Sequence, residues 1–166
     1  MRMPAIAIAL AICIAPTLAF PADIHISASR TEAPAPVPGY LDSSRELVLY
    51  ALGLIGVRYK FGGNSPELGF DCSGLVRYVY LQTIGLALPH NAREISRAGE
   101  TVPQSDLQPG DLVFYNTLRQ PFSHVGIYLG DQRFVHAPSR GGGVEIVDMR
   151  ESYWTKRYDG SRRVTF

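Results

Sequence analysis

The order of the hydrophobic patterns along this chain constrains its fold more than any other feature. Apolar residues recur at helical spacing in the first part of the sequence, and short β-branched and aromatic segments separated by turns follow later. Helices first and strands afterwards, with short connections, predict an α+β domain in which N-terminal helices pack on a central antiparallel β-sheet. We expect helices at residues 43–56, 72–84 and 91–98, and strands at residues 112–115, 125–129, 133–137, 144–147 and 162–166.

Capping residues mark the ends of the expected helices. Ser43 with Glu46 three residues later has the pattern of a capping box, and so does Asn91 with Glu94. Gly85 can end the middle helix in a left-handed conformation. The same pattern predicts that this middle helix begins at Cys72, directly after a glycine-rich loop.

The N-terminal part of the chain has the organisation of an export signal. Arg2 precedes an apolar segment at residues 6–14, and small residues at positions 17–19 are suited to cleavage, so we expect a signal peptide at residues 1–19. We expect a Pro/Ala-rich tether at residues 20–39 and a folded domain at residues 40–166 to follow. A membrane anchor is disfavoured because Pro16 interrupts a segment that is short for spanning a bilayer. Lipid attachment at Cys13 is disfavoured by the bulky Ile12 before it. We expect an exported protein with no integral membrane segment after signal removal.

The charge and the cysteine content of the chain limit its possible functions. The chain has 16 basic and 15 acidic residues without a run of one sign, which gives no basic footprint for a nucleic acid. Removal of the signal takes Cys13 away and leaves Cys72 as the single cysteine, so no internal disulfide can form. A lone cysteine in an exported protein is a buried inert thiol, a partner for intermolecular pairing, or a thiol that does chemistry.

Two histidines supply candidate partners for Cys72. A catalytic thiol needs a base, and we expect His124 to take its proton and to hold the charge as an ion pair. His124 and His136 lie on consecutive predicted strands. A three-residue loop at residues 130–132 would pair Gly126 with His136 and place both histidines on one face, whereas a two-residue loop would separate them. We assign His136 the role of orienting His124.

Other residues near Cys72 have both catalytic and structural interpretations. The Cys72 amide at the helix start could stabilise an oxyanion, and the Tyr59 phenol could reach the same pocket. Tyr59 could equally be a core aromatic residue, and Asp71 could simply cap the helix. A zinc site made of Cys72, His124 and His136 is disfavoured because no local ligand pair has metal-site spacing. Glycines 62 and 63 lack the lysine and spacing of a phosphate-binding loop. We expect no metal or organic cofactor.

Five motifs occupy residues 59–63, 70–76, 109–114, 123–130 and 134–137. Together they resemble the motifs of the NlpC family of cell-wall cysteine peptidases. The resemblance implies a papain-like fold and a triad of Cys72, His124 and His136. It also implies a Tyr59 hydroxyl near the oxyanion site, and roles for Asp71 and Ser73 in shaping the pocket and binding substrate. His90 departs from the residues that many relatives have at this place, which leaves the preference on that side of the groove open.

The resemblance also implies the reaction. It predicts a periplasmic or cell-wall-associated endopeptidase that hydrolyses amide bonds in peptidoglycan stem peptides through a thioester acyl-enzyme. We expect the protein to be a monomer. Two bonds are open: D-glutamyl to diamino acid within a stem, and the D-alanyl to diamino acid cross-link between stems. The alternatives are an N-acyl amidase or acyltransferase with the same triad, and a wall-binding module without catalysis.

Overall fold

The computed structural model describes residues 40–140 and 142–165, so the predicted signal peptide and tether lie outside the described residues. Four helices, one 3-10 turn and eight strands occur in these two ranges. None of the helices described is both long and apolar enough to cross a bilayer. The elements are α1 (Tyr40–Leu52), β1 (Asn64–Ser65), β2 (Gly69–Phe70), α2 (Cys72–Ile84), α3 (Ala92–Ile95), β3 (Glu100–Thr101), η1 (Gln104–Asp106), β4 (Leu112–Tyr115), β5 (His124–Gly130), β6 (Arg133–His136), β7 (Glu145–Asp148), α4 (Ser152–Thr155) and β8 (Tyr158–Arg163).

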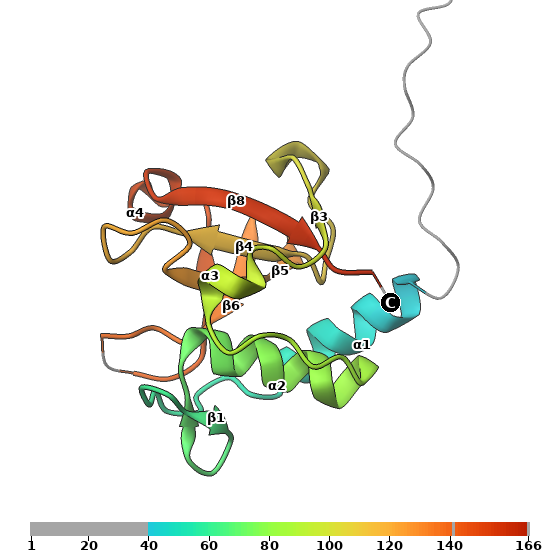
Figure 1. Ribbon diagram of the computed structural model, residues 1–166, viewed down its shortest axis with the longest axis vertical. Coiled ribbons are helices and arrows are strands. Elements are labelled where there is room, and N and C mark those ends of the chain that lie inside the picture. Colours follow the sequence, from blue (N-terminus) through green and yellow to red (C-terminus); the bar gives the residue numbers. More distant parts are fainter. Residues whose placement is uncertain (1–39, 141, 166) are drawn as a thin grey trace, which may run out of the picture. The chain divides into compact units, whose positions relative to one another are not determined.

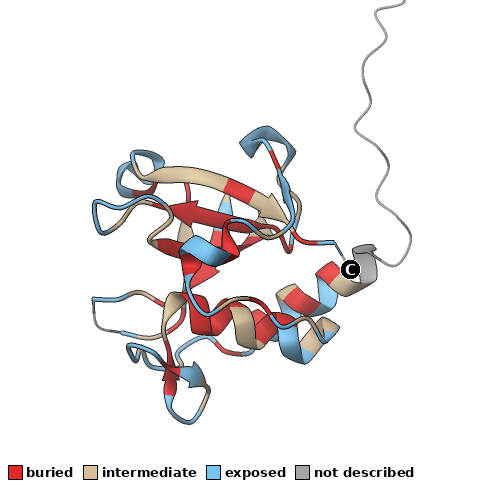
Figure 2. Cartoon of the chain, viewed as in Figure 1, coloured by how far each residue is buried: buried red, intermediate tan, exposed pale blue. Residues whose placement is uncertain are grey.

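Six of the strands form one antiparallel sheet in the order β3-β8-β4-β5-β6-β7, and helices α1 and α2 lie together on one side of it (Figure 1). This confirms the predicted α+β class and the packing of N-terminal helices on an antiparallel sheet. The alternating side chains of β4 divide between two cores. Leu112 and Phe114 face the helices, while Val113 and Tyr115 join a second cluster that contains Trp154 of α4. All four residues of β4 are therefore buried, and Figure 2 shows this burial along the middle of the sheet.

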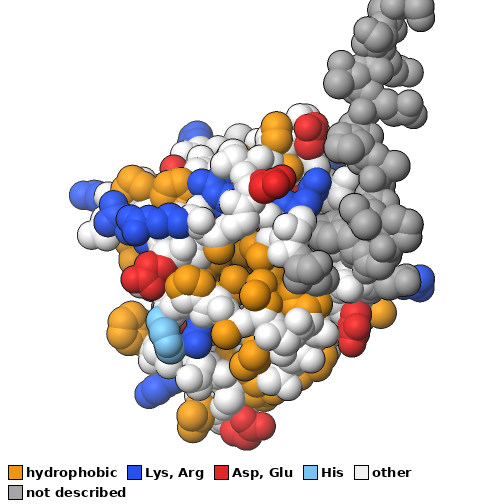
Figure 3. Space-filling model, turned by 45° about the vertical axis from the view of Figure 1, so that its right-hand side comes forward, with side chains coloured by type: hydrophobic (Ala, Val, Ile, Leu, Met, Phe, Trp, Pro, Cys, Tyr) orange, Lys and Arg blue, Asp and Glu red, His pale blue; other side chains and the backbone are white. Residues whose placement is uncertain are grey.

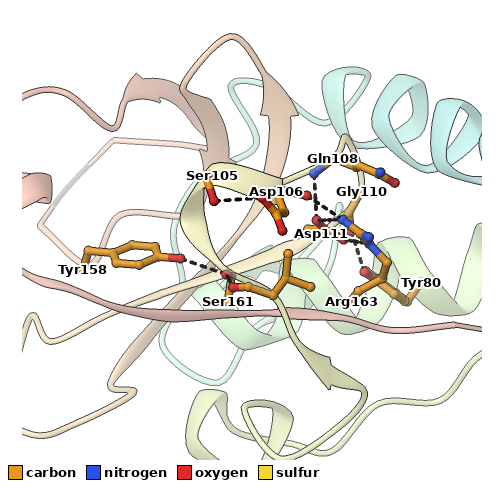
Figure 4. A network of polar contacts seen from close by, with 10 residues as sticks. Tyr80, Ser105, Asp106, Gln108, Gly110, Asp111, Tyr158, Ser161 and Arg163 are labelled. Atoms are coloured by element: carbon orange, nitrogen blue, oxygen red, sulfur yellow. Dashed lines mark hydrogen bonds and ion pairs between the residues drawn. The ribbon is translucent and has the colours of Figure 1, made fainter. Parts of the chain in front are cut away.

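A buried ion pair ties β8 to the start of β4. The Arg163 guanidinium donates to both carboxylate oxygens of Asp111, at 2.8 Å and 2.7 Å, and Asp111 has no exposed surface. Beside it, the Tyr80 hydroxyl of α2 donates to the Gly110 carbonyl oxygen at 2.7 Å. The Tyr80 contact holds α2, the helix that begins at Cys72, against the segment that leads into β4 (Figure 4).

Several predicted boundaries were wrong. Helix α1 begins before Ser43, which therefore lies inside the helix and is not its N-cap. Asn91 does cap α3, accepting from the Glu94 amide at 2.9 Å, but this helix ends at Ile95. The last strand spans Tyr158–Arg163 and not residues 162–166, because pairing with β4 overrides the weak strand propensity of its polar sequence. The short elements β1, β2, β3, η1 and α4 had no sequence signal that we identified.

The turn between β5 and β6 is shorter than the three residues that we predicted, yet Gly126 and His136 lie opposite each other as predicted. Gly130 pairs with Arg133, so the turn has two residues, Asp131 and Gln132, both with positive φ. A bulge between Tyr128 and Gly130 absorbs one residue on β5. Beyond it, Ile127 pairs with Val135, and the same register extended by one residue sets Gly126 opposite His136. The bulge offsets the shorter turn, so His124 and His136 share a face.

Candidate active site

Cys72 is the first residue of α2, where helix geometry and a tight loop position it. Asp71 is the N-cap, and its Oδ1 accepts from the Gly74 amide at 2.7 Å while its Oδ2 accepts from the Gly62 amide at 2.9 Å. Gly74 has no room for a side chain, since a Cβ would lie 2.0 Å from the Gly63 carbonyl oxygen. The glycine-rich loop is thus held closely against the first turn of α2.

The Cys72 thiol lies where the start of α2 packs against β5. The backbone N–H groups of Val125, Ser73 and Cys72 lower the pKa of the Cys72 thiol in part, but burial has the larger effect and raises this pKa to about 11. Val125 directly follows His124 in β5. The thiol therefore lies next to the backbone at the start of the strand that carries the first histidine.

The two predicted histidines form a hydrogen-bonded pair. His124 Nε2 lies 2.8 Å from His136 Nδ1, and both side chains are buried. The Trp154 indole stacks on the His124 ring with 5.8 Å between centroids and meets the His136 ring edge-on at 5.0 Å. Trp154 limits rotation of both rings, and we did not identify this role from the sequence because Trp154 lies apart from the motifs, on the short helix α4.

Burial favours the neutral forms of both the thiol and the imidazoles. Desolvation lowers the pKa of His124 to about 4, and desolvation together with the neighbouring His124 lowers the pKa of His136 to about 3. Burial of Cys72 and His124 therefore disfavours the resting ion pair that we expected between them. The arrangement suits a neutral imidazole that accepts the thiol proton as the sulfur attacks a substrate.

The remaining predicted site residues lie close to Cys72. Tyr59 forms an isolated β-bridge with Phe70, two residues before Cys72, and burial, followed by the charges of Asp71 and Cys72, raises the pKa of its phenol. The Ser73 hydroxyl lies 3.0 Å from Asp71 Oδ1 and 3.1 Å from the His90 carbonyl oxygen, and it donates to one of them. The side chains of Asp71 and Ser73 thus have structural hydrogen bonds within the loop. Their substrate-binding roles stay predictions.

A hollow of about 270 Å³ opens beside the histidine pair on the side of α4 and the loop after β6. Its lining includes His124, His136, Glu145 and Trp154. Within the described ranges, 40–140 and 142–165, no group of three or more Cys, His, Asp or Glu side chains could hold a metal ion. On the face drawn in Figure 3, acidic and basic side chains are interspersed around a central hydrophobic area.

An α+β domain that presents a cysteine at a helix start and a histidine pair on the adjoining strands has the organisation of thiol hydrolases. Comparison with known proteins supports this assignment to the thiol hydrolases. The profile of the NlpC/P60 family matches residues 56–163, and the chain belongs to this family.

Relatives with known names share this region. The chain is 42% identical over 113 residues to murein DD-endopeptidase MepH of Escherichia coli K12, covering 66% of this chain and 42% of the relative. It is 46% identical over 110 residues to a gamma-DL-glutamyl hydrolase of Bacillus subtilis 168, covering 66% of this chain and 26% of the relative. The chain therefore spans less than half of either relative.

Solved structures of the family have the same fold. The NlpC/p60 domain of the peptidoglycan hydrolase SagA aligns with a TM-score of 0.65 at 32% identity, over 73% of this chain and 98% of that one. An NLP/P60 family protein of Staphylococcus aureus Mu50 aligns with a TM-score of 0.69 at 33% identity, over 81% of this chain and 45% of that one.

Proposed function

We propose that this protein is a cysteine endopeptidase that hydrolyses amide bonds in peptidoglycan stem peptides. One observation carries the proposal: Cys72 is the first residue of α2, the Val125 amide of β5 acts on the pKa of its thiol, and the residue before Val125, His124, is hydrogen-bonded to His136. Relatives named as a murein DD-endopeptidase and as a gamma-DL-glutamyl hydrolase support the substrate class. Such a substrate requires export, which agrees with the signal peptide expected from the sequence.

In the proposed reaction, Cys72 and His124 act together. The Cys72 sulfur attacks the scissile carbonyl carbon while its proton moves to His124. Amide donors at the start of α2, with the Tyr59 hydroxyl nearby, stabilise the oxyanion. His124 then protonates the leaving amine, and a thioester with Cys72 remains. Water, deprotonated by His124, hydrolyses the thioester and releases the acid and the free thiol.

Both of the bonds considered above stay candidates. The name of the MepH relative favours the D-alanyl to diamino acid cross-link, and the name of the hydrolase relative favours the D-glutamyl bond within a stem. Transfer of an acyl group to an amine by the same thioester chemistry is the alternative reaction. A wall-binding module without catalysis is disfavoured because Cys72, His124 and His136 are all present.

Digestion of purified muropeptides followed by mass spectrometry tests the proposal. We expect the wild type to release fragments cut at one of the two bonds and to incorporate one water oxygen per cleavage in H₂¹⁸O. Replacement of Cys72 by Ala should reduce turnover by about 10⁴-fold or more while the protein stays folded. Digestion by Cys72→Ala at the wild-type rate would rule out the proposed mechanism, and acyl transfer without incorporated oxygen would favour the alternative reaction.

A further inference from the structure

The histidine pair leaves one buried nitrogen without a partner. His136 Nδ1 faces His124, but His136 Nε2 has no hydrogen-bond partner within the described part of the chain, and the residue is 1% exposed. A buried ring nitrogen of this kind is unfavourable in either protonation state unless a nearby group compensates it. The surroundings of this atom therefore affect how the pair is protonated.

Glu145 is the group that faces this nitrogen. Its Oε1 lies 3.5 Å from His136 Nε2, and the two residues are direct cross-strand partners on β6 and β7. The backbone before Glu145 is fixed, because Val144 exchanges two 2.8 Å hydrogen bonds with residues of the loop after α1, from the Gly56 amide and to the Val57 carbonyl oxygen. The Glu145 side chain lies on the lining of the 270 Å³ hollow and is 54% exposed.

Two proton arrangements are open to the neutral histidine pair. In the first, His124 Nε2–H donates to His136 Nδ1, so His136 carries its proton on Nε2 and His124 keeps a lone pair on Nδ1. In the second, His136 Nδ1–H donates to His124 Nε2, and His124 then carries its own proton on Nδ1. Only the first arrangement leaves His124 able to accept a proton from a thiol at Nδ1.

The Glu145 carboxylate discriminates between these arrangements. In the first, the His136 Nε2–H bond dipole points at a negative group. In the second, the Nε2 lone pair faces that group, which is unfavourable. We propose that Glu145 is a positioning residue that selects the Nε2–H tautomer of His136 and thereby keeps the Nδ1 lone pair of His124 available as the base. This inference rests on the proposed function and adds a fourth member, Glu145, to the set Cys72, His124 and His136.

The contact is expected to have a moderate effect. At 3.5 Å the two atoms are beyond ordinary hydrogen-bond distance, and solvent reaches the carboxylate. For Glu145→Gln we expect kcat to fall about tenfold with KM unchanged. The substitution shifts the tautomer equilibrium about tenfold toward the arrangement in which His124 cannot act as the base, and it removes no substrate contact.

Asp131→Asn is the matched control. It makes the same change of charge at the turn of the β5–β6 hairpin, on a side chain that is 89% exposed. We expect its kcat to stay within twofold of the wild type. An equal loss in both variants, or wild-type kcat in Glu145→Gln, would overturn the inference.

Nitrogen-15 NMR of the full chain tests the tautomers without substrate. In the wild type at neutral pH, both His124 and His136 should carry their proton on Nε2. In Glu145→Gln, the population of the Nδ1–H form of His136 should rise. A wild-type His136 protonated on Nδ1 would overturn the inference even if the enzyme is active. Conversely, if wild-type protein did not cleave muropeptides, the proposed function would fail while this measurement still decided the tautomer.

Discussion

His124 Nε2 lies 2.8 Å from His136 Nδ1, and the two residues come from neighbouring strands whose register is set by a bulge in β5. Trp154 covers both rings, so the pair is shielded from water as well as oriented. This burial controls how the two rings titrate.

The stability of the protein should fall as the pH drops from 7 to 5. Both histidines have a folded-state pKa below the unfolded value of about 6.5, so the unfolded chain binds protons in this range that the folded chain does not. The folded state loses stability as the pH falls through the unfolded pKa, by about 2 kcal/mol per histidine at pH 5. Urea unfolding at the two pH values measures this, and His136→Asn should show roughly half the difference. A free energy of unfolding that is equal at pH 5 and pH 7 would contradict the burial argument.

The Cys72 thiol of the free protein should react with iodoacetamide mainly at high pH. Burial raises its pKa to about 11, so the thiolate fraction increases up to that value. We expect the alkylation rate to rise continuously between pH 7 and pH 10 without a plateau at low pH. Mass spectrometry of the modified chain gives the rate, and Cys72→Ala is the control for other sites. A plateau that begins near pH 5 would instead demonstrate the resting ion pair that the sequence analysis expected.

Replacement of Asp71 by Ala should destabilise the start of α2. The carboxylate accepts from the amides of Gly62 and Gly74, so its loss leaves two donors without their partner. We expect a cost of about 1–2 kcal/mol in the free energy of unfolding, with Asp71→Asn costing less because its amide oxygen can still cap the helix. Chemical denaturation of the three proteins measures both values. Equal stability of Asp71→Ala and the wild type would indicate that the loop is held by other contacts.

Arg163→Ala should be among the more damaging substitutions away from the active site. It would remove two charged hydrogen bonds from the buried Asp111 carboxylate, at a cost of about 3–5 kcal/mol. Arg162→Ala is the matched control, because the side chain of Arg162 is partly exposed and donates to the carbonyl oxygen of the adjacent Ser161. We expect the control to cost less than about 1 kcal/mol in thermal or urea unfolding. Comparable losses in the two variants would show that the Asp111 contact is not the source of the effect.

The sequence by itself determined the local features of this protein. Hydrophobic spacing and glycine signals were sufficient to predict α2 from Cys72 to its left-handed cap at Gly85, and strand composition predicted β4, β5 and β6 to within about two residues. The combination of motifs indicated the family and the candidate residues Cys72, His124 and His136. These signals are local, since they depend on residues that are neighbours in the chain.

The tertiary structure decided what depends on residues far apart in the chain. The two-residue turn with its compensating bulge, the covering of both histidines by Trp154 and the approach of Glu145 to His136 all follow from the packing of separate strands and helices. The protonation states of the thiol and the imidazoles also follow from this packing, because desolvation depends on all the atoms that surround a group and not on its neighbours in the sequence.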